Sequence, residues 1–195
     1  MFYTPEDYLA FEKILAEGLK RYPVDLLTYG LMPNHGHLVL RPRTDRGLSR
    51  FMGWLGVTHA RRHHAHYHPS AGGHVYQGRF KSFPLQDDEH FLVVCRYVEA
   101  NAVRARLCRR ARDWRWCGLY ARAHADKPPL AGWPVERPSG WAALVEESLE
   151  KKMLKSLRTS VSRGRPFGSE SWVMRWAKRL GLESTLRPRG RPKKD

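Results

Sequence analysis

The stretch that decides the fold is residues 24–40, Val-Asp-Leu-Leu-Thr-Tyr-Gly-Leu-Met-Pro-Asn-His-Gly-His-Leu-Val-Leu. Residues 24–31 and 35–40 are rich in side chains typical of strands, and the Met-Pro-Asn turn between them is short. Strands joined this closely run antiparallel, so the sequence predicts a β-hairpin. Its second strand begins with His35 and His37, and residues two apart on a strand point to the same face. Both imidazoles should therefore project together.

Helical patterns surround this hairpin. Residues 5–21 carry an apolar stripe at helical spacing, with Pro, Glu and Asp in the first turn. Further helices are expected from about residues 46 to 67 and from about 89 to 104. Between them, the side chains of residues 74–85 alternate enough to predict another strand. The sequence thus predicts an α+β fold, in which helices pack on an antiparallel sheet.

The net charge of +16, from 35 Lys+Arg against 19 Asp+Glu, indicates a polyanionic partner, with nucleic acid first. No apolar run approaches the roughly 20 residues that span a bilayer, and no secretory signal precedes the first helix. The three cysteines lack metal-site or disulfide spacing, which is typical of a reducing compartment. We therefore expect a cytoplasmic, nucleoid-associated protein with no membrane partner.

Composition divides the chain into three parts. Residues 1–150 hold 21 Lys+Arg and 16 Asp+Glu and are nearly balanced. Within the chain we expect a folded body over residues 1–122, a linker with four prolines over residues 123–140, and a basic C-terminal extension over residues 141–195. Residues 151–195 alone hold 14 Lys+Arg and 3 Asp+Glu, a net charge of +11. Helices are expected within the extension over 141–160 and 169–181.

Two Arg-Gly-Arg-Pro segments lie in the extension, at residues 163–166 and 189–192. The second, flanked by Pro188 and followed by two lysines, resembles an AT-hook, whose extended Arg-Gly-Arg lies in the minor groove of A/T-rich DNA. The alternative is a generic basic tail that gains affinity only by releasing counterions. The DNA-binding candidates of the extension are the arginines of both segments, Arg163, Arg165, Arg189 and Arg191.

Two pairs of residues could carry chemistry. Two imidazoles on one face, His35 and His37, suit a divalent metal, and a half-exposed structural pair is the alternative. Tyr97 and Asn101 are four residues apart on an expected helix, which places them about one turn apart on one face. A tyrosine can be a covalent nucleophile, and an amide oxygen can complete a metal's shell. The alternative is that Tyr97 packs its ring while Asn101 caps the helix.

A His-rich stretch over residues 58–68 offers another possible metal site, because His59 and His63 share a helix face. No carboxylate or cysteine stands at ligand spacing beside them. We therefore expect a basic helix face that lies on DNA phosphates, in preference to a zinc site.

Three segments follow one another in a telling order: residues 31–40, Leu-Met-Pro-Asn-His-Gly-His-Leu-Val-Leu; residues 76–83, Tyr-Gln-Gly-Arg-Phe-Lys-Ser-Phe; and residues 96–105, Arg-Tyr-Val-Glu-Ala-Asn-Ala-Val-Arg-Ala. Together they resemble the REP-associated tyrosine transposases of the HUH single-tyrosine class. The resemblance runs from about Tyr3 to Trp116 and continues weakly into the basic tail.

This resemblance implies a ferredoxin-like α+β body and a metal-dependent endonuclease that cuts and rejoins single-stranded DNA near REP-like hairpins. It implies that His35 and His37 bind Mg²⁺ or Mn²⁺, that Asn101 completes the metal shell, and that Tyr97 forms a 5′-phosphotyrosine. The partners would be single-stranded or hairpin DNA, with duplex DNA held by the tail, and the protein would act as a monomer or homodimer. Further DNA-binding candidates are Arg79, Lys81 and Arg104.

The sequence departs from the family pattern in two places. Gly36 stands where the middle residue of the HUH motif is normally bulky and hydrophobic. Relatives usually have a further strand before the helix at residue 5, so we expect the sheet to lack its first strand here. The alternative function is that of a catalytically inactive relative, which binds DNA without cleaving it.

Overall fold

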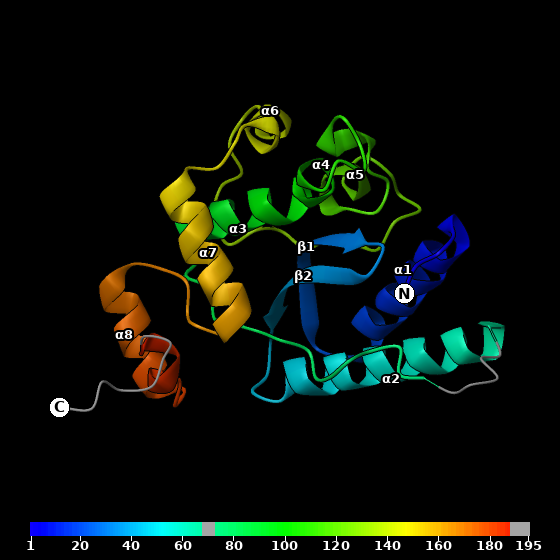
Figure 1. Ribbon diagram of the computed structural model, residues 1–195, viewed down its shortest axis with the longest axis horizontal. Helices are drawn as coiled ribbons and strands as arrows, with labels where there is room; N and C mark the ends of the chain where they lie inside the picture. Colours follow the sequence, from blue (N-terminus) through cyan, green and yellow to red (C-terminus); the bar gives the residue numbers. More distant parts are fainter. Residues whose placement is uncertain (68–72, 188–195) are drawn as a thin grey trace. The chain divides into compact units, whose positions relative to one another are not determined.

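A computed structural model describes residues 1–67 and 73–187, and it has the α+β architecture that the sequence predicts (Figure 1). The chain forms two compact units. Unit 1 comprises Met1–Phe80 and Cys95–Ser148, and unit 2 comprises Lys81–Val94 and the chain from Leu149 onward. Each unit is thus built from two separate stretches of the chain.

The sheet of unit 1 is the predicted hairpin. β1 (Val24–Met32) and β2 (His35–Pro42) pair antiparallel, and the register sets Met32 opposite His35 and Gly30 opposite His37. Every residue of β1 is buried, whereas β2 is exposed at both ends. β1 therefore lies inside the core, whereas the first residues of β2, which include His35, are exposed to solvent.

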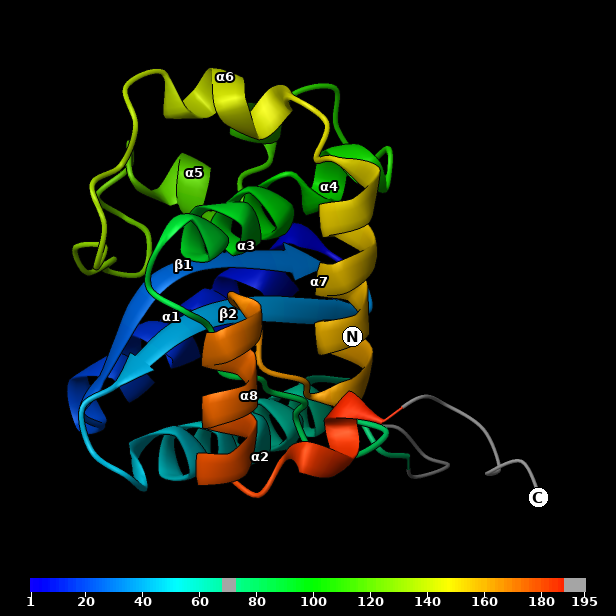
Figure 2. The ribbon, with the colours of Figure 1, turned by 90° about the vertical axis from the view of Figure 1, so that its left-hand side faces the viewer.

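Helices cover both faces of this sheet. α1 (Pro5–Arg21) and α2 (Gly47–Tyr67) pack against each other and against the two strands. On the other face lie the end of α3 (Glu89–Glu99), α4 (Asn101–Arg104) and α5 (Gly118–Ala121), as Figure 2 shows. The expected helix over 89–104 is therefore present, with a break at Ala100 between α3 and α4.

Local sequence explains where α1 begins and why it packs inward. The backbone N–H groups of Tyr3 and Thr4 donate to Asp7 Oδ2 at 2.7 and 3.0 Å, which satisfies donors that the first turn leaves free. The apolar stripe of α1 joins the core under the sheet, where the Trp116 ring stacks on Tyr8 at 4.8 Å. The largest fully buried members of this core are Ile14, Leu15, Leu26, Tyr29, Leu31, Phe51 and Leu55.

The outer edge of β1 is covered by later parts of the chain. Leu31 N–H donates to the Trp116 carbonyl at 2.9 Å, and Ala131 N–H donates to the Leu26 carbonyl at 2.8 Å. A buried ion pair between Lys127 Nζ and Glu12 Oε2, at 2.9 Å, joins the segment around Lys127 to α1. Residues 123–140 are thus packed within unit 1, and their role as a linker between functional domains stays a prediction.

The strand expected over residues 74–85 is absent. Residues 73–84 are not in a strand, and Leu85 forms only an isolated bridge with Phe167. Alternation of side chains predicts a strand only where a neighbouring strand supplies hydrogen-bond partners. Among the described residues, none pairs with 74–84 in this way.

The basic face expected over residues 58–68 does not include His59, although Arg61 and Arg62 are exposed. The His59 side chain is only 3% exposed, its ring contacts Phe11, and its Nδ1 lies 2.6 Å from the Tyr76 hydroxyl. Burial lowers the pKa of His59 to about 4, so the imidazole is neutral. His59 follows Phe51 and Leu55 at intervals of four, which puts it on the buried stripe of α2.

Unit 2 is a small helical unit around Phe167, which is 2% exposed. α7 (Lys151–Arg163) ends at Gly164, whose φ of +70° suits a residue without a side chain. α8 (Glu170–Arg179) fulfils the expectation of a helix near 169–181. The region expected as one helix over 141–160 instead contains α6 (Trp141–Glu146) in unit 1 and the start of α7 in unit 2.

Two short 3₁₀ turns complete the described elements, η1 (Ala111–Asp113) in unit 1 and η2 (Glu183–Leu186) in unit 2. Over residues 1–67 and 73–187, the helices are too short or too polar to cross a lipid bilayer. This agrees with the sequence, where no long apolar run occurs.

Candidate active site

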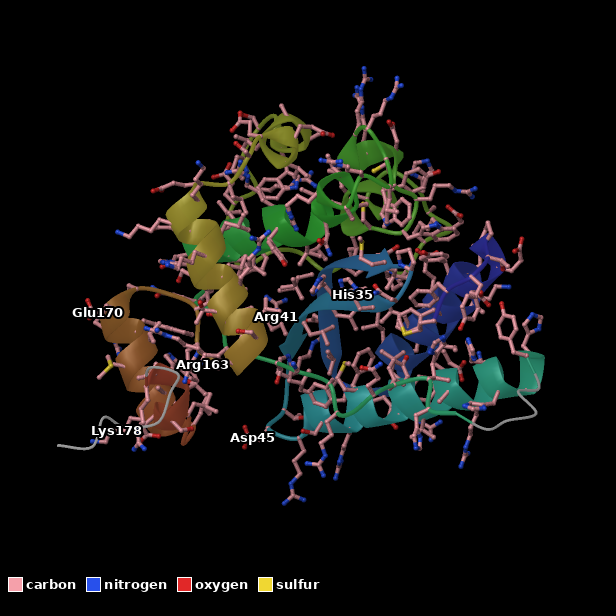
Figure 3. All side chains as sticks on the ribbon, viewed as in Figure 1. His35, Arg41, Asp45, Arg163, Glu170 and Lys178 are labelled. Atoms are coloured by element: carbon pink, nitrogen blue, oxygen red, sulfur yellow. The ribbon has the colours of Figure 1, made fainter. Side chains whose placement is uncertain are left out.

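The paired histidines stand together at the start of β2, where Figure 3 labels His35. The ring centroids of His35 and His37 are 5.0 Å apart, as the alternation of the strand predicts. His35 Nδ1 lies 2.7 Å from Asn34 Oδ1. Because a carbonyl oxygen only accepts, this contact assigns the proton to Nδ1 and leaves the Nε2 lone pair for a ligand.

The surroundings of both histidines favour the neutral imidazole. Burial lowers the pKa of His37 to about 4, with smaller contributions from the charges of His35 and Arg104. Burial also lowers the pKa of His35. A neutral imidazole has a free nitrogen lone pair, which is the form that binds a metal ion.

Tyr97 approaches the histidines from the end of α3. Its ring centroid lies 5.8 Å from that of His37, in an edge-to-face arrangement. The approach is possible because Gly30, opposite His37, has no side chain: a Cβ there would come within 2.7 Å of the Val98 carbonyl oxygen. The absent side chain at position 30 therefore lets the backbone beside Tyr97 lie against the sheet.

Asn101 and Arg104 lie on α4, which directly follows the end of α3 that carries Tyr97. Arg104 donates from Nη2 to the Tyr97 carbonyl oxygen and, at 3.1 Å, to Asn101 Oδ1. The guanidinium carbon of Arg104 lies 4.1 Å from the centre of the Tyr97 ring. The other amide atom, Asn101 Nδ2, is buried and has no hydrogen-bond partner among the described residues.

The side chains present fit a divalent cation. Two neutral imidazoles and the Asn101 amide oxygen could hold the ion, and this oxygen keeps a second lone pair beside its bond to Arg104. In the described part of the chain, three His, Cys, Asp or Glu side chains come together only at Asp88, Glu89 and His90. That cluster lies in unit 2, where Asp88 accepts the backbone N–H of His90 at the start of α3.

Gly36 is not required by the packing around it. A Cβ at this position would meet Leu31 Cδ2 at 3.1 Å, the end of a flexible side chain. A small side chain would fit after a slight shift of Leu31. With glycine at position 36, the rings of His35 and His37 lie 5.0 Å apart on one face of β2.

The remaining predicted DNA-binding residues lie in both units or outside the described residues. Arg79 and Lys81 are exposed. Arg163 is half-buried and donates to the Ser184 carbonyl at 3.3 Å, within unit 2. Arg165 is also half-buried, while Arg189 and Arg191 fall outside the described residues. DNA binding by this set stays a prediction.

Sequence reasoning assigned Arg104 to DNA and overlooked its contacts with Tyr97 and Asn101. The signal was present, because positions 97, 101 and 104 follow the i, i+4, i+7 spacing of one helix face. It also overlooked Glu99, which is fully buried and accepts from Thr28 Oγ1 at 2.5 Å and from Trp141 Nε1 at 2.7 Å. Those two partners are distant in sequence, so no local pattern could have found them.

The rings of His35, His37 and Tyr97 thus lie together in unit 1, at the start of β2 and the end of α3. The family model described as "Transposase IS200 like" matches residues 2–101, a range that includes His35, His37, Tyr97 and Asn101. The chain therefore belongs to the IS200-like transposase family, a class of DNA-binding proteins that carry out DNA transposition. No curated protein and no solved structure shows a significant match.

Proposed function

We propose that this protein cuts and rejoins single-stranded DNA through a covalent bond between Tyr97 and a 5′-phosphate, with Mg²⁺ or Mn²⁺ held by His35, His37 and Asn101. The observation that carries the proposal is the edge-to-face contact of Tyr97 with His37 at 5.8 Å, because it puts a nucleophile beside candidate metal ligands. The order of the three motifs supports the narrower assignment to REP-associated transposases, which act at hairpins.

The residues define a balanced reaction. Tyr97 Oη bonds to phosphorus and loses its proton to solvent, while the bond from phosphorus to the 3′ oxygen breaks and that oxygen leaves with the electron pair. A bound cation would stabilise the negative charge that develops on the phosphate oxygens. The phosphotyrosine ester conserves the energy of the broken bond, so the 3′-OH of another strand can reverse the step without ATP.

The test is covalent capture of labelled DNA. Wild type, incubated with Mn²⁺ and a 3′-labelled hairpin-bearing single strand, should give an adduct that survives denaturing electrophoresis, and Tyr97→Phe should give none. DNA affinity should stay within about threefold, because phosphate contacts supply most of it. Tyr120→Phe, which removes a hydroxyl from a ring stacked on His124, is the matched control and should form the adduct.

Two outcomes would overturn this function. Equal adduct from wild type and Tyr97→Phe would show that another group attacks the phosphate. DNA binding with no adduct from wild type, unaffected by His35→Ala or His37→Ala, would favour the non-catalytic DNA-binding relative.

A row of cations on α7 supports the proposal that the C-terminal region also holds duplex DNA. Three cationic residues, Lys151, Lys155 and Arg158, share one face of the helix and border a groove of about 490 Å³. The groove is completed by Leu154, Thr159 and Ser162, so it contains two hydroxyls and no carboxylate. Cations and hydroxyls in this arrangement suit a row of phosphates.

Neutralising this row should reduce the salt dependence of duplex binding. A triple variant with Lys151, Lys155 and Arg158 changed to Gln should flatten the slope of log K against log[salt] by about 2 to 3 units, since each lost phosphate contact removes about 0.9. The slope comes from fluorescence anisotropy over a salt series. Changing the exposed Lys13 and Lys20 of α1 to Gln is the control, and an unchanged slope in the triple variant would exclude this surface.

A further inference from the structure

Arg104 contacts two of the residues that carry the proposed reaction. Its guanidinium donates to the Tyr97 carbonyl oxygen and to Asn101 Oδ1, and its central carbon lies 4.1 Å from the middle of the Tyr97 ring. The Arg104 side chain is half-buried. These contacts occupy part of a side chain that the sequence had assigned to DNA alone.

We propose that Arg104 is a positioning residue, which holds the Tyr97 ring and the Asn101 amide in the arrangement needed for attack on the phosphate. This inference rests on the proposed function of Tyr97 as the nucleophile. It gives Arg104 a role that acts through its neighbours, separate from any contact with DNA.

The contact with Tyr97 restricts the ring. A tyrosine near the end of a helix can place its hydroxyl in several directions by rotating about χ1. A planar guanidinium over the ring face favours one of these rotamers through the cation–π interaction, and the bond to the Tyr97 carbonyl anchors the guanidinium to the same residue. Holding a nucleophile in the reactive orientation accelerates a reaction, because less conformational entropy is lost on reaching the transition state.

The contact with Asn101 fixes the orientation of the side-chain amide, with Oδ1 facing Arg104. Oδ1 accepts from Arg104, whereas Nδ2 is buried without a partner among the described residues. Without Arg104, a half-turn of the amide would exchange the two atoms and present a donor where a metal ligand must be an acceptor. The guanidinium therefore fixes the oxygen, which retains a lone pair for a cation.

Lysine could not replace arginine here. An ammonium group has no planar face to lie over the ring and acts as a compact point charge. Arg104→Lys therefore separates orientation from charge, because the variant keeps the positive charge and loses the stacked fork. Arg104→Gln removes both.

The experiment measures single-turnover adduct formation and DNA affinity for wild type, Arg104→Gln and Arg104→Lys. Both variants should form the adduct at least about tenfold more slowly at saturating DNA, the effect expected of a misoriented nucleophile. Their DNA dissociation constants should rise less than about threefold, since one phosphate contact at most is lost. Arg50→Gln, which removes an exposed charge from α2, is the control and should match wild type.

A second measurement does not depend on chemistry. With 3-fluorotyrosine incorporated, the ¹⁹F resonance of position 97, assigned by its loss in Tyr97→Phe, should move towards the free amino acid in both Arg104 variants. An unmoved resonance, a full adduct rate in Arg104→Lys, or a defect confined to DNA affinity would each overturn the inference. Absence of adduct from wild type would instead end the proposed function, and the ¹⁹F comparison would still decide whether Arg104 fixes the ring.

Discussion

Replacing His37 with Ala should lower the rate of adduct formation at least about 10³-fold in the presence of Mn²⁺, since a lost metal contact to the reacting phosphate removes several kcal/mol of stabilisation. His37 is the imidazole in contact with Tyr97, and its low pKa of about 4 keeps the nitrogen available to a cation at neutral pH. The measurement is the single-turnover rate over a series of Mn²⁺ concentrations. DNA affinity should change little, because the imidazole is uncharged.

The control for this prediction is His74→Ala, which removes an exposed imidazole elsewhere in unit 1. This variant should retain the rate and metal dependence of wild type. If His37→Ala forms the adduct at the wild-type rate, His37 is not a metal ligand. If the rate falls but recovers fully at high Mn²⁺, His37 contributes to affinity for the ion and the remaining ligands suffice for the reaction.

Replacing Glu99 with Ala should lower the free energy of unfolding by about 4 kcal/mol, because two buried donors would lose their acceptor and a cavity would remain. Glu99 accepts from Thr28 at 2.5 Å and from Trp141 at 2.7 Å, and thus ties α3 to β1 and to α6. Gly118 closes the same cluster, since a Cβ there would overlap Thr28 Oγ1. Urea denaturation measures the loss, and Glu147→Ala at an exposed position is the control.

The ionisation of Glu99 gives this prediction a pH dependence. Burial raises the pKa of Glu99, so the folded state favours the protonated carboxyl more than the unfolded state does. The corresponding stability is fully present below the unfolded pKa, near 4.3, and is lost as the pH rises through the higher folded-state pKa. Glu99→Gln, which cannot ionise, should therefore lose less stability than wild type as the pH rises above about 4.3. Parallel curves for the two proteins would contradict this account.

The parts of the fold that the sequence predicted are those that local patterns control. The hairpin over 24–40 depends on neighbouring residues, and so does the shared face of His35 and His37. The absent strand over 74–85 shows the limit, since alternation describes one strand and carries no information about its partner.

Long-range contacts account for what the sequence could not predict. The buried pair of Lys127 with Glu12 joins positions 115 residues apart, and the bond of Glu99 to Thr28 joins positions 71 apart. Both involve charged or titratable side chains that composition places at the surface. Their burial follows from the way later segments cover β1, which only the folded chain displays.

Gly30 has a consequence for how the spacing of the site is encoded. The distance between Tyr97 and the histidines depends on how closely the backbone at Val98 can approach β1, and this approach is limited by the residue at position 30. Glycine at this position allows the closest approach between the backbones of β1 and the end of α3. The position of Tyr97 is thus determined partly by a residue that has no reactive group. The end of α3 packs on the sheet at a separation that the residue at position 30 limits.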